Sequence, residues 1–342
     1  MINVIKKLII ACSILPILAV GCGWKEEVII SGSTMGTTYQ IKIITSYFNS
    51  LKGLKEKIDK RLDEINQNMS TYRPDSEISR FNAIQDSQAR FRISNDFLNV
   101  MQVAQRIYER SDGAWDGTIK PLVNLWGFGN TRNVQQVPIE SDIKATLSVV
   151  GFQHIHVSAE GYLQKKLGPL TLDLASIAKG YAVDQISRLL KDLGLVHFLV
   201  EIGGEVYAAG YRKDGSSWRV GINQPDISAA VTDTYQVVPL HNRAMATSGD
   251  YRNYFEVQGH RYSHILDPRT GYPVNNGVVS VSVVADNCML ADGLATAVMV
   301  MGHEVGLALI ASLDRVEALI IIRNADTTLS NYASNAFGSE PD

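Results

Sequence analysis

The order of the predicted helices and strands limits most strongly what this chain can fold into. Apolar residues at helical spacing mark one amphipathic helix within residues 51–69, with Leu54, Ile58, Leu62 and Ile65 on its apolar face. Further helices are predicted at residues 94–110, from Ser141-Asp142, at 177–193 and at 288–301. Strands are predicted at residues 38–43, 198–206, 218–222, 235–238, 254–257, 278–284 and 316–322, with shorter ones within 151–172.

These elements are mixed without the strict strand–helix–strand alternation that builds a parallel sheet. We therefore expect an α+β fold with mixed, largely antiparallel sheets and packed helices. The sequence after residue 323 is polar, which predicts an irregular C-terminal end.

The first two dozen residues have the features of a secretory signal peptide. Lys6 and Lys7 form a short positive region, and an apolar stretch follows over residues 8–20. Cys22 comes directly after a small residue, as in a bacterial lipobox, so we expect it to be lipidated. An ordinary cleaved signal peptide or an uncleaved anchor is the alternative. The predicted organisation is a signal peptide at 1–21, a lipidated tether at 22–30, one catalytic domain at 31–330 and a polar tail at 331–342.

Cysteine usage and net charge restrict the chemistry further. The mature chain would keep only Cys22 and Cys288, and a disulfide between them would join a flexible end to a buried segment. We therefore expect Cys288 to be a small core residue. A net charge of −3 gives no electrostatic reason to expect nucleic-acid binding.

Asp292 and Thr296 are spaced to lie on one face of a predicted helix, one turn apart. A carboxylate and a hydroxyl are hard oxygen ligands of the kind that Mg²⁺ prefers. The alternative is that Asp292 merely interacts with the dipole of a helix start. A metal site is favoured because a charged group in so apolar a segment needs a partner.

Three other segments could bind an anion or transfer a proton. Residues 172–181 form a strand-to-helix turn with Lys179 one turn into the helix, which would present N–H groups and a positive charge. Gly203-Gly204 indicates a bulge or a ligand close to the backbone. His264 could transfer protons near neutral pH. A capped surface helix, a structural bulge and a structural histidine are the respective alternatives.

Two loop-like segments carry aromatic residues, and two other segments are similar to each other in sequence. Residues 69–72 and 113–116 carry Tyr72 and Trp115, which could stack on a flat heterocycle or pack in the core. Residues 177–182 are similar to residues 290–295, which indicates a duplicated helix-entry element. A chance match between short sequences rich in alanine and glycine is the alternative.

The order of these motifs resembles the FAD:protein FMN transferase (ApbE) family over nearly the whole mature chain. The matching segments are residues 35–37, 69–82, 113–116, 121–129, 172–184, 203–205, 246–254, 264–273 and 291–296. The resemblance implies an ApbE-like, T-fold-related architecture. It also implies an enzyme that cleaves FAD, releases AMP and attaches FMN through a phosphoester to a threonine or serine of a partner redox protein.

The same resemblance implies roles for individual residues. Asp292, Thr296 and a backbone carbonyl near Ser176 would hold Mg²⁺, and His264 would stand near the transferred phosphate, with His264 or Asp292 as the general base. The FAD site would be lined by Met35, Tyr72, Ala114, Trp115, Asp116, Asp173, Lys179, His264 and Ile265. This chain departs from the family pattern around Ala175-Ser176, where the family often has glycine or alanine. It also departs at Trp115, where the family commonly has phenylalanine.

The resemblance also suggests where the protein works and with what. Expected acceptors are subunits of the Na⁺-translocating quinone reductase or a related electron-transport complex, reached from the periplasmic side of a bacterial membrane. An FAD pyrophosphatase that releases FMN and AMP, or a periplasmic flavin-binding lipoprotein, would share the same pocket residues.

Overall fold

The computed structural model describes residues 25–46, 51–129, 137–225, 233–250 and 253–340. Cys22 and the predicted signal peptide therefore lie outside the described residues. Within these ranges no helix is both long enough and apolar enough to cross a membrane.

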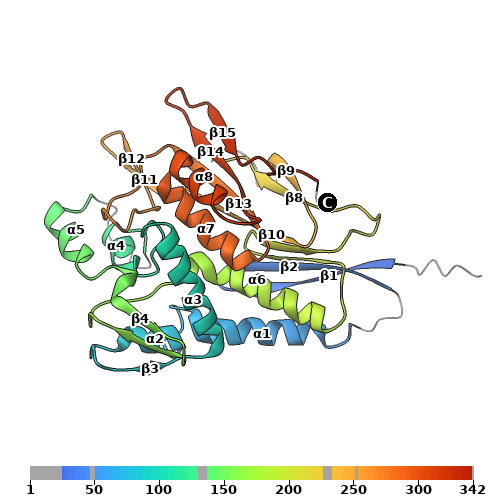
Figure 1. Cartoon of the computed structure of the whole chain (residues 1–342), viewed down its shortest axis with the longest axis horizontal. Coiled ribbons are helices and arrows are strands. Elements are labelled where there is room, and N and C mark those ends of the chain that lie inside the picture. Colours follow the sequence, from blue (N-terminus) through green and yellow to red (C-terminus); the bar gives the residue numbers. More distant parts are fainter. Residues whose placement is uncertain (1–24, 47–50, 130–136, 226–232, 251–252, 341–342) are drawn as a thin grey trace, which may run out of the picture.

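One eight-stranded antiparallel sheet runs through the molecule (Figure 1). Its strands, in spatial order, are β1 (Lys25–Thr34), β2 (Thr37–Ser46), β6 (Phe198–Ile202), β7 (Glu205–Ala209), β10 (Arg243–Gly249), β13 (Val278–Ala285), β14 (Glu317–Arg323) and β15 (Leu329–Ala333). Smaller antiparallel sheets are formed by β3 (Phe91–Arg92), β5 (Tyr162–Lys165) and β4 (Ile155–Ser158), by β8 (Trp218–Asn223) and β9 (Thr234–Leu240), and by β11 (Tyr254–Val257) and β12 (His260–Ser263).

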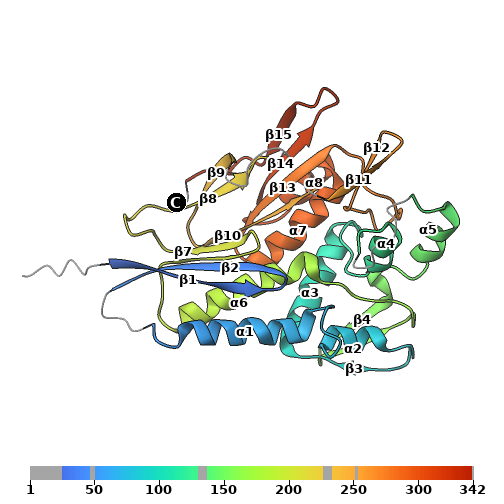
Figure 2. The same ribbon diagram turned by 180° about the vertical axis from the view of Figure 1, so that it is seen from behind.

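The helices lie mainly on one face of the large sheet, as opposite views of the ribbon show (Figures 1 and 2). They are α1 (Leu54–Met69), α2 (Glu77–Ala83), α3 (Asn95–Arg110), α4 (Lys120–Leu125), α5 (Glu140–Leu147), α6 (Ala175–Asp192), α7 (Cys288–Met301) and α8 (His303–Ala311). Helices α1, α3 and α6 share one apolar core with β2 and β6, whereas α7 and α8 share another with β10, β13 and β14. The β8–β9 hairpin covers part of the opposite face.

The two halves of the large sheet have the same topology. In the first half, β1 and β2 come before α6 in the chain, and β6 and β7 come directly after it. In the second half, β10 and β13 come before α7 and α8, and β14 and β15 come directly after them. The two similar segments, residues 177–182 and 290–295, begin at the third residue of α6 and of α7 respectively. The expected duplication of a helix-entry element therefore corresponds to equivalent positions in the fold.

Local sequence explains the predicted helices that the structure confirms. The five buried residues of α1 lie on one stripe, from Leu54 to Met69. Helix α3 begins after Ser94, whose hydroxyl accepts the Phe97 N–H as an N-cap. Helix α7 is buried along most of its length, with Cys288 fully buried as a free thiol. Cys288 is thus a core residue, as expected.

Three predictions differ from the structure. The strand predicted at 198–206 is two strands, because Gly203-Gly204, with φ of 63° and 102°, forms the turn between β6 and β7 and not a bulge. Strand β1 begins at Lys25, so most of the predicted tether belongs to the sheet. The polar C-terminal end contains β15, which completes the sheet by pairing with β14.

Candidate active site

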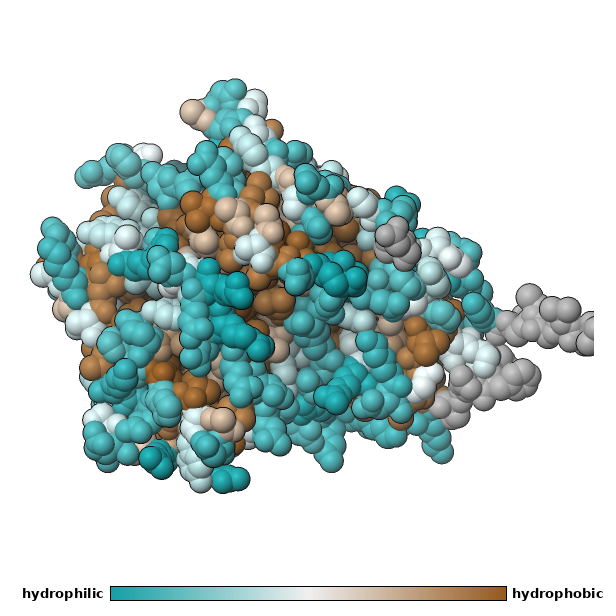
Figure 3. Space-filling view, in the orientation of Figure 1, coloured by the Kyte–Doolittle hydropathy of each residue, from teal (hydrophilic) through white to brown (hydrophobic). Residues whose placement is uncertain are grey.

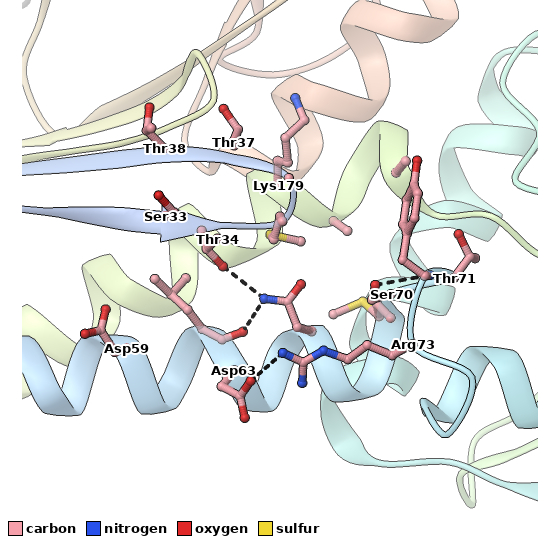
Figure 4. A pocket seen from close by; sticks show the side chains of 18 of the residues that line it. Ser33, Thr34, Thr37, Thr38, Asp59, Asp63, Ser70, Thr71, Arg73 and Lys179 are labelled. Carbon is pink, nitrogen blue, oxygen red and sulfur yellow. Dashed lines mark hydrogen bonds and ion pairs between the residues drawn. The ribbon is translucent and has the colours of Figure 1, made fainter. Parts of the chain in front are cut away.

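Two cavities adjoin where the N-terminal end of α6 approaches the large sheet. The larger one, about 1160 Å³, lies between the β1–β2 hairpin and α1 (Figure 4). The smaller one, about 410 Å³, lies between the start of α6 and α7, and His264 lines it. Tyr72, Asp173, Ala175 and Lys179 line both. Two joined cavities of this size suit an elongated ligand with two bulky halves.

The β1–β2 turn and an exposed tyrosine form one end of the larger cavity. Met35 (φ 51°) and Gly36 (φ 73°) make a two-residue turn, and the Asn66 side chain of α1 donates a hydrogen bond to Thr34 at 2.9 Å. The Tyr72 side chain is 76% exposed at the rim. Met35 and Tyr72, both predicted to contact FAD, therefore line the same cavity.

Asp173 begins the turn that leads into α6 and is held there by two interactions. One carboxylate oxygen accepts the Ala175 N–H at 3.0 Å, and the other pairs with Lys120 Nζ at 3.1 Å. Lys120 also donates to the Thr71 hydroxyl at 2.8 Å. This network links the wall that bears Tyr72 to the start of α6.

Helices α6 and α7 are joined by reciprocal contacts between acidic side chains and backbone N–H groups. Asp292 of α7 accepts the Gly180 N–H at 3.0 Å, and Asp184 of α6 accepts the N–H groups of Cys288 and Met289 at 2.7 and 2.9 Å. Gly180 permits the close approach, because an added Cβ would lie 2.4 Å from the Cys288 carbonyl oxygen. Asp292 is thereby fixed on the wall of the smaller cavity.

The three predicted metal ligands all line the smaller cavity. The Thr296 and Ser248 hydroxyls lie 3.3 Å apart, and the Ser176 hydroxyl accepts the Trp115 indole N–H at 3.0 Å. In a regular helix the Gly180 N–H would donate to the Ser176 carbonyl. Because Asp292 also accepts a hydrogen bond from this N–H group, the Ser176 carbonyl oxygen is more available to bind a cation.

These oxygen atoms fit a magnesium ion better than a softer metal. In the described ranges no group of three or more His, Cys, Asp or Glu side chains could hold a metal, so the set depends on one carboxylate, one hydroxyl and one carbonyl. Burial raises the pKa of Asp292, and Lys179 opposes that rise. A cation beside Asp292 would likewise stabilise the charged form of this buried carboxylate.

Glu205, at the start of β7, is a second buried acid in this cavity and was not predicted as a site residue. Its Oε1 accepts from Lys179 Nζ at 2.6 Å, whereas its buried Oε2 has no hydrogen-bond partner. Burial, assisted by the charge of Asp292, raises the pKa of Glu205 to about 8. The Gly-Gly-Glu sequence was the available signal, but it did not reveal the pairing with Lys179.

His264 has one ring nitrogen committed to the backbone. Its Nδ1 lies 3.0 Å from the Asn253 carbonyl oxygen, which can only accept, so Nδ1 carries the proton. Burial lowers the pKa of His264. The neutral ring therefore has a lone pair on Nε2, which is the form a general base requires. Ile265, also predicted, lines the same cavity.

Three predicted FAD contacts lie behind the cavity walls. Ala114 and Trp115 are each 1% exposed, and neither is among the residues that line the two cavities. Asp116 is buried and accepts hydrogen bonds from Thr118 and from the Phe152 N–H. Trp115 is joined to the site by its hydrogen bond to Ser176.

Comparison with known proteins gives the same family from sequence and from structure. The model of the ApbE family matches residues 35–320. FAD:protein FMN transferases from Vibrio cholerae and Escherichia coli K12 are 44% and 39% identical, covering 91% and 82% of this chain and 92% and 80% of their own.

Two solved structures are similarly close. A flavin transferase ApbE from Vibrio cholerae is 40% identical with a TM-score of 0.82, and the apo flavinyl transferase ApbE of Pseudomonas stutzeri is 37% identical with a TM-score of 0.81. Each alignment covers 91% of this chain, and 98% and 96% of the respective structure. The chain therefore belongs to the ApbE family.

Proposed function

We propose that this protein is an FAD:protein FMN transferase, which cleaves FAD and joins FMN through a phosphoester to a threonine or serine of a partner redox protein. The names of its relatives support the proposal. The observation that carries it is that Asp173 and Lys179 lie at the junction of two cavities, with Asp292 on the wall of the smaller cavity. A pyrophosphate between two bulky halves would bring its negative charge to such a junction.

The residues that would hold Mg²⁺ are Asp292, Thr296 and, through its carbonyl, Ser176. Mg²⁺ bound there would neutralise negative charge on the pyrophosphate and polarise its oxygen atoms. Lys179 adds a fixed positive charge at the same place. Met35, Tyr72, Asp173 and Ile265 would contact FAD directly, whereas Ala114, Trp115 and Asp116 would shape the site from behind its wall.

His264 is the better of the two candidates for general base. One oxygen of Asp292 is committed to the Gly180 N–H and the other to the proposed metal, whereas His264 Nε2 has a free lone pair. In the proposed reaction the acceptor hydroxyl gives its proton to Nε2 as its oxygen bonds to the FMN phosphorus. The bond from that phosphorus to the bridging oxygen breaks, and AMP leaves with that oxygen.

Sequence features and the family support a proposal for the location and for the acceptor. We place the protein on the periplasmic side of a bacterial membrane, anchored by lipid on Cys22. The proposed acceptors are subunits of the Na⁺-translocating quinone reductase or a related electron-transport complex. Globomycin-sensitive processing and palmitate labelling that disappear in Cys22→Ser would support the anchor, and unchanged labelling would contradict it.

Product analysis separates the transferase from enzymes that would use the same pocket. The purified protein is incubated with FAD, Mg²⁺ and an acceptor subunit, and AMP, free FMN and protein-bound FMN are quantified. A transferase yields AMP and protein-bound FMN in equal amounts. Free FMN with no adduct would indicate a pyrophosphatase, and no AMP at all would indicate a flavin-binding protein. Adduct formation that survives in Asp292→Ala would contradict the metal assignment.

A further inference from the structure

Lys179 lies near two buried carboxylates but contacts only one of them. Its ammonium donates to Glu205 Oε1 at 2.6 Å, and its charge acts on Asp292 as well as on Glu205. In the part of the chain that the structure describes, Asp292 forms no direct ion pair and its Oδ1 accepts no hydrogen bond. The oxygen that would face a metal is therefore left open although a lysine is close by.

The β6–β7 turn fixes this choice of partner. Glu205 follows Gly203-Gly204 directly, and the Gly203 N–H donates to the Thr38 carbonyl at 3.1 Å. A Cβ on Gly203 would lie 2.8 Å from the Thr37 methyl and 3.3 Å from Lys179 Cδ. The turn thus packs against the alkyl chain of Lys179, and Glu205, which follows the turn, accepts the hydrogen bond from the Lys179 ammonium.

A lysine next to a single buried carboxylate would bind that carboxylate and occupy the place of a metal ion. We propose that Glu205 is a positioning residue that holds Lys179 away from Asp292 and so keeps Asp292 Oδ1 open for Mg²⁺. This inference rests on the metal assignment made above. It assigns Glu205 to the organisation of the metal site and not to contact with FAD.

The inference differs from a simple effect of charge. If Glu205 acted only through its negative charge, removing that charge would weaken metal binding, removing Lys179 would strengthen it, and the two effects would add. If Glu205 acts by holding Lys179, the loss of Glu205 weakens metal binding only while Lys179 is present, so the two effects do not add. A double-mutant cycle therefore separates the two explanations.

The experiment measures Mn²⁺ binding to the full chain without FAD, from the electron paramagnetic resonance signal of free Mn²⁺, with Mg²⁺ as competitor. Glu205→Gln should weaken binding about tenfold, within the range of coupling between contacting residues. Lys179→Met should bind Mn²⁺ at least as tightly as the unchanged protein, and the Lys179→Met/Glu205→Gln double variant should bind within about twofold of Lys179→Met.

Glu201→Gln is the matched control. Glu201 lies on the strand before the same turn and feels the charge of Lys179, but its carboxylate accepts the Gly204 N–H and does not pair with the lysine. Its loss removes one nearby negative charge and should leave Mn²⁺ binding unchanged. Thermal unfolding confirms that each variant is folded before binding is compared.

Each outcome has a defined meaning. Unchanged binding in Glu205→Gln, or additive effects in the cycle, would overturn the positioning role and leave the proposed function intact. Failure of the unchanged protein to bind Mn²⁺, or equal binding in Asp292→Ala, would overturn the metal assignment and the inference with it.

Discussion

At the scale of single residues, burial sets the protonation state of the groups that face the smaller cavity. It lowers the pKa of His264 and raises the pKa values of Glu205 and Asp292. In each case burial favours the uncharged form. A neutral histidine can accept a proton from the acceptor hydroxyl, and buried carboxyl groups favour binding of a cation. Both properties are suited to phosphoryl transfer.

His264 gives a prediction for the pH dependence of transfer. Because its pKa is lowered, the ring stays neutral below the ordinary histidine value of about 6.5, so the acid limb of the kcat profile should lie below that pH. His264→Gln should reduce kcat by about 10²–10⁴-fold and abolish that limb, while FAD affinity changes far less.

His260 provides the matched control for this measurement, because it is exposed on β12, four positions earlier in the chain. His260→Gln should leave both the rate and the profile unchanged. An acid limb that persists unaltered in His264→Gln would rule out His264 as the general base.

Some contacts between site residues could be predicted from the sequence, and others could not. Asp292 and Thr296 could be proposed as a pair because they lie one helical turn apart. The ion pair between Lys179 and Glu205 joins residues 26 positions apart on a helix and a strand, and no spacing rule predicts it. Whether Trp115 faced a cavity or the core could not be predicted either, since both readings fit an aromatic in a loop.

At the scale of elements, the α6–α7 contact positions the proposed metal ligands, and two glycines at equivalent helix positions test it. An added Cβ at Gly180 meets the rigid Cys288 carbonyl at 2.4 Å, whereas one at Gly293 meets the terminal methyl of Ile107 at 2.4 Å. A terminal methyl can rotate aside, but a backbone carbonyl in a packed helix cannot.

Gly180→Ala should therefore destabilise the protein by about 1–3 kcal/mol and weaken Mn²⁺ binding, because Asp292 is displaced. Gly293→Ala should be close to neutral, since about 1 kcal/mol of helix propensity offsets the repacking. Chemical denaturation and Mn²⁺ titration of both variants measure this. Equal effects at the two glycines would contradict the importance of the helix contact.

Sequence patterns predicted the elements whose burial is one-sided or complete. Helices α1 and α3 have apolar stripes, and β13 is entirely buried and rich in valine. Strand β1 was missed because most of its side chains are exposed at the sheet edge, so that apolar and polar residues do not alternate in its sequence. Helix α8 was missed because it is short and apolar but exposes Val305, in a region where apolar residues reach the surface (Figure 3).

At the scale of the whole molecule, buried carboxyl groups should make stability depend on pH. The pKa of Glu205 is about 8 and those of Asp184 and Asp250 are about 6, all raised chiefly by burial. In the unfolded chain, the pKa of a carboxyl group is about 4. Between pH 4 and 8 the folded state therefore binds more protons than the unfolded state, so the free energy of unfolding falls as pH rises.

Without divalent cations, we expect that free energy to fall by on the order of 5 kcal/mol between pH 5 and pH 8. Glu205→Gln should flatten the upper part of this range, and Mg²⁺ should restore stability there by compensating the buried negative charge. Urea denaturation at each pH measures it. Stability that rises from pH 5 to pH 8 in the absence of metal would contradict the assigned directions.

Transfer of FMN by this protein to another protein changes the mass of the acceptor, and that mass is the measurement of choice. An acceptor subunit is incubated with the enzyme, FAD and Mg²⁺, unfolded, and analysed by intact mass and peptide mapping. We expect the mass to increase by one FMN phosphoester on a single threonine or serine. The increase should be absent when that residue is replaced by alanine or when the enzyme carries Asp292→Ala. An acceptor of unchanged mass, while the enzyme consumes FAD, would contradict the proposed transfer.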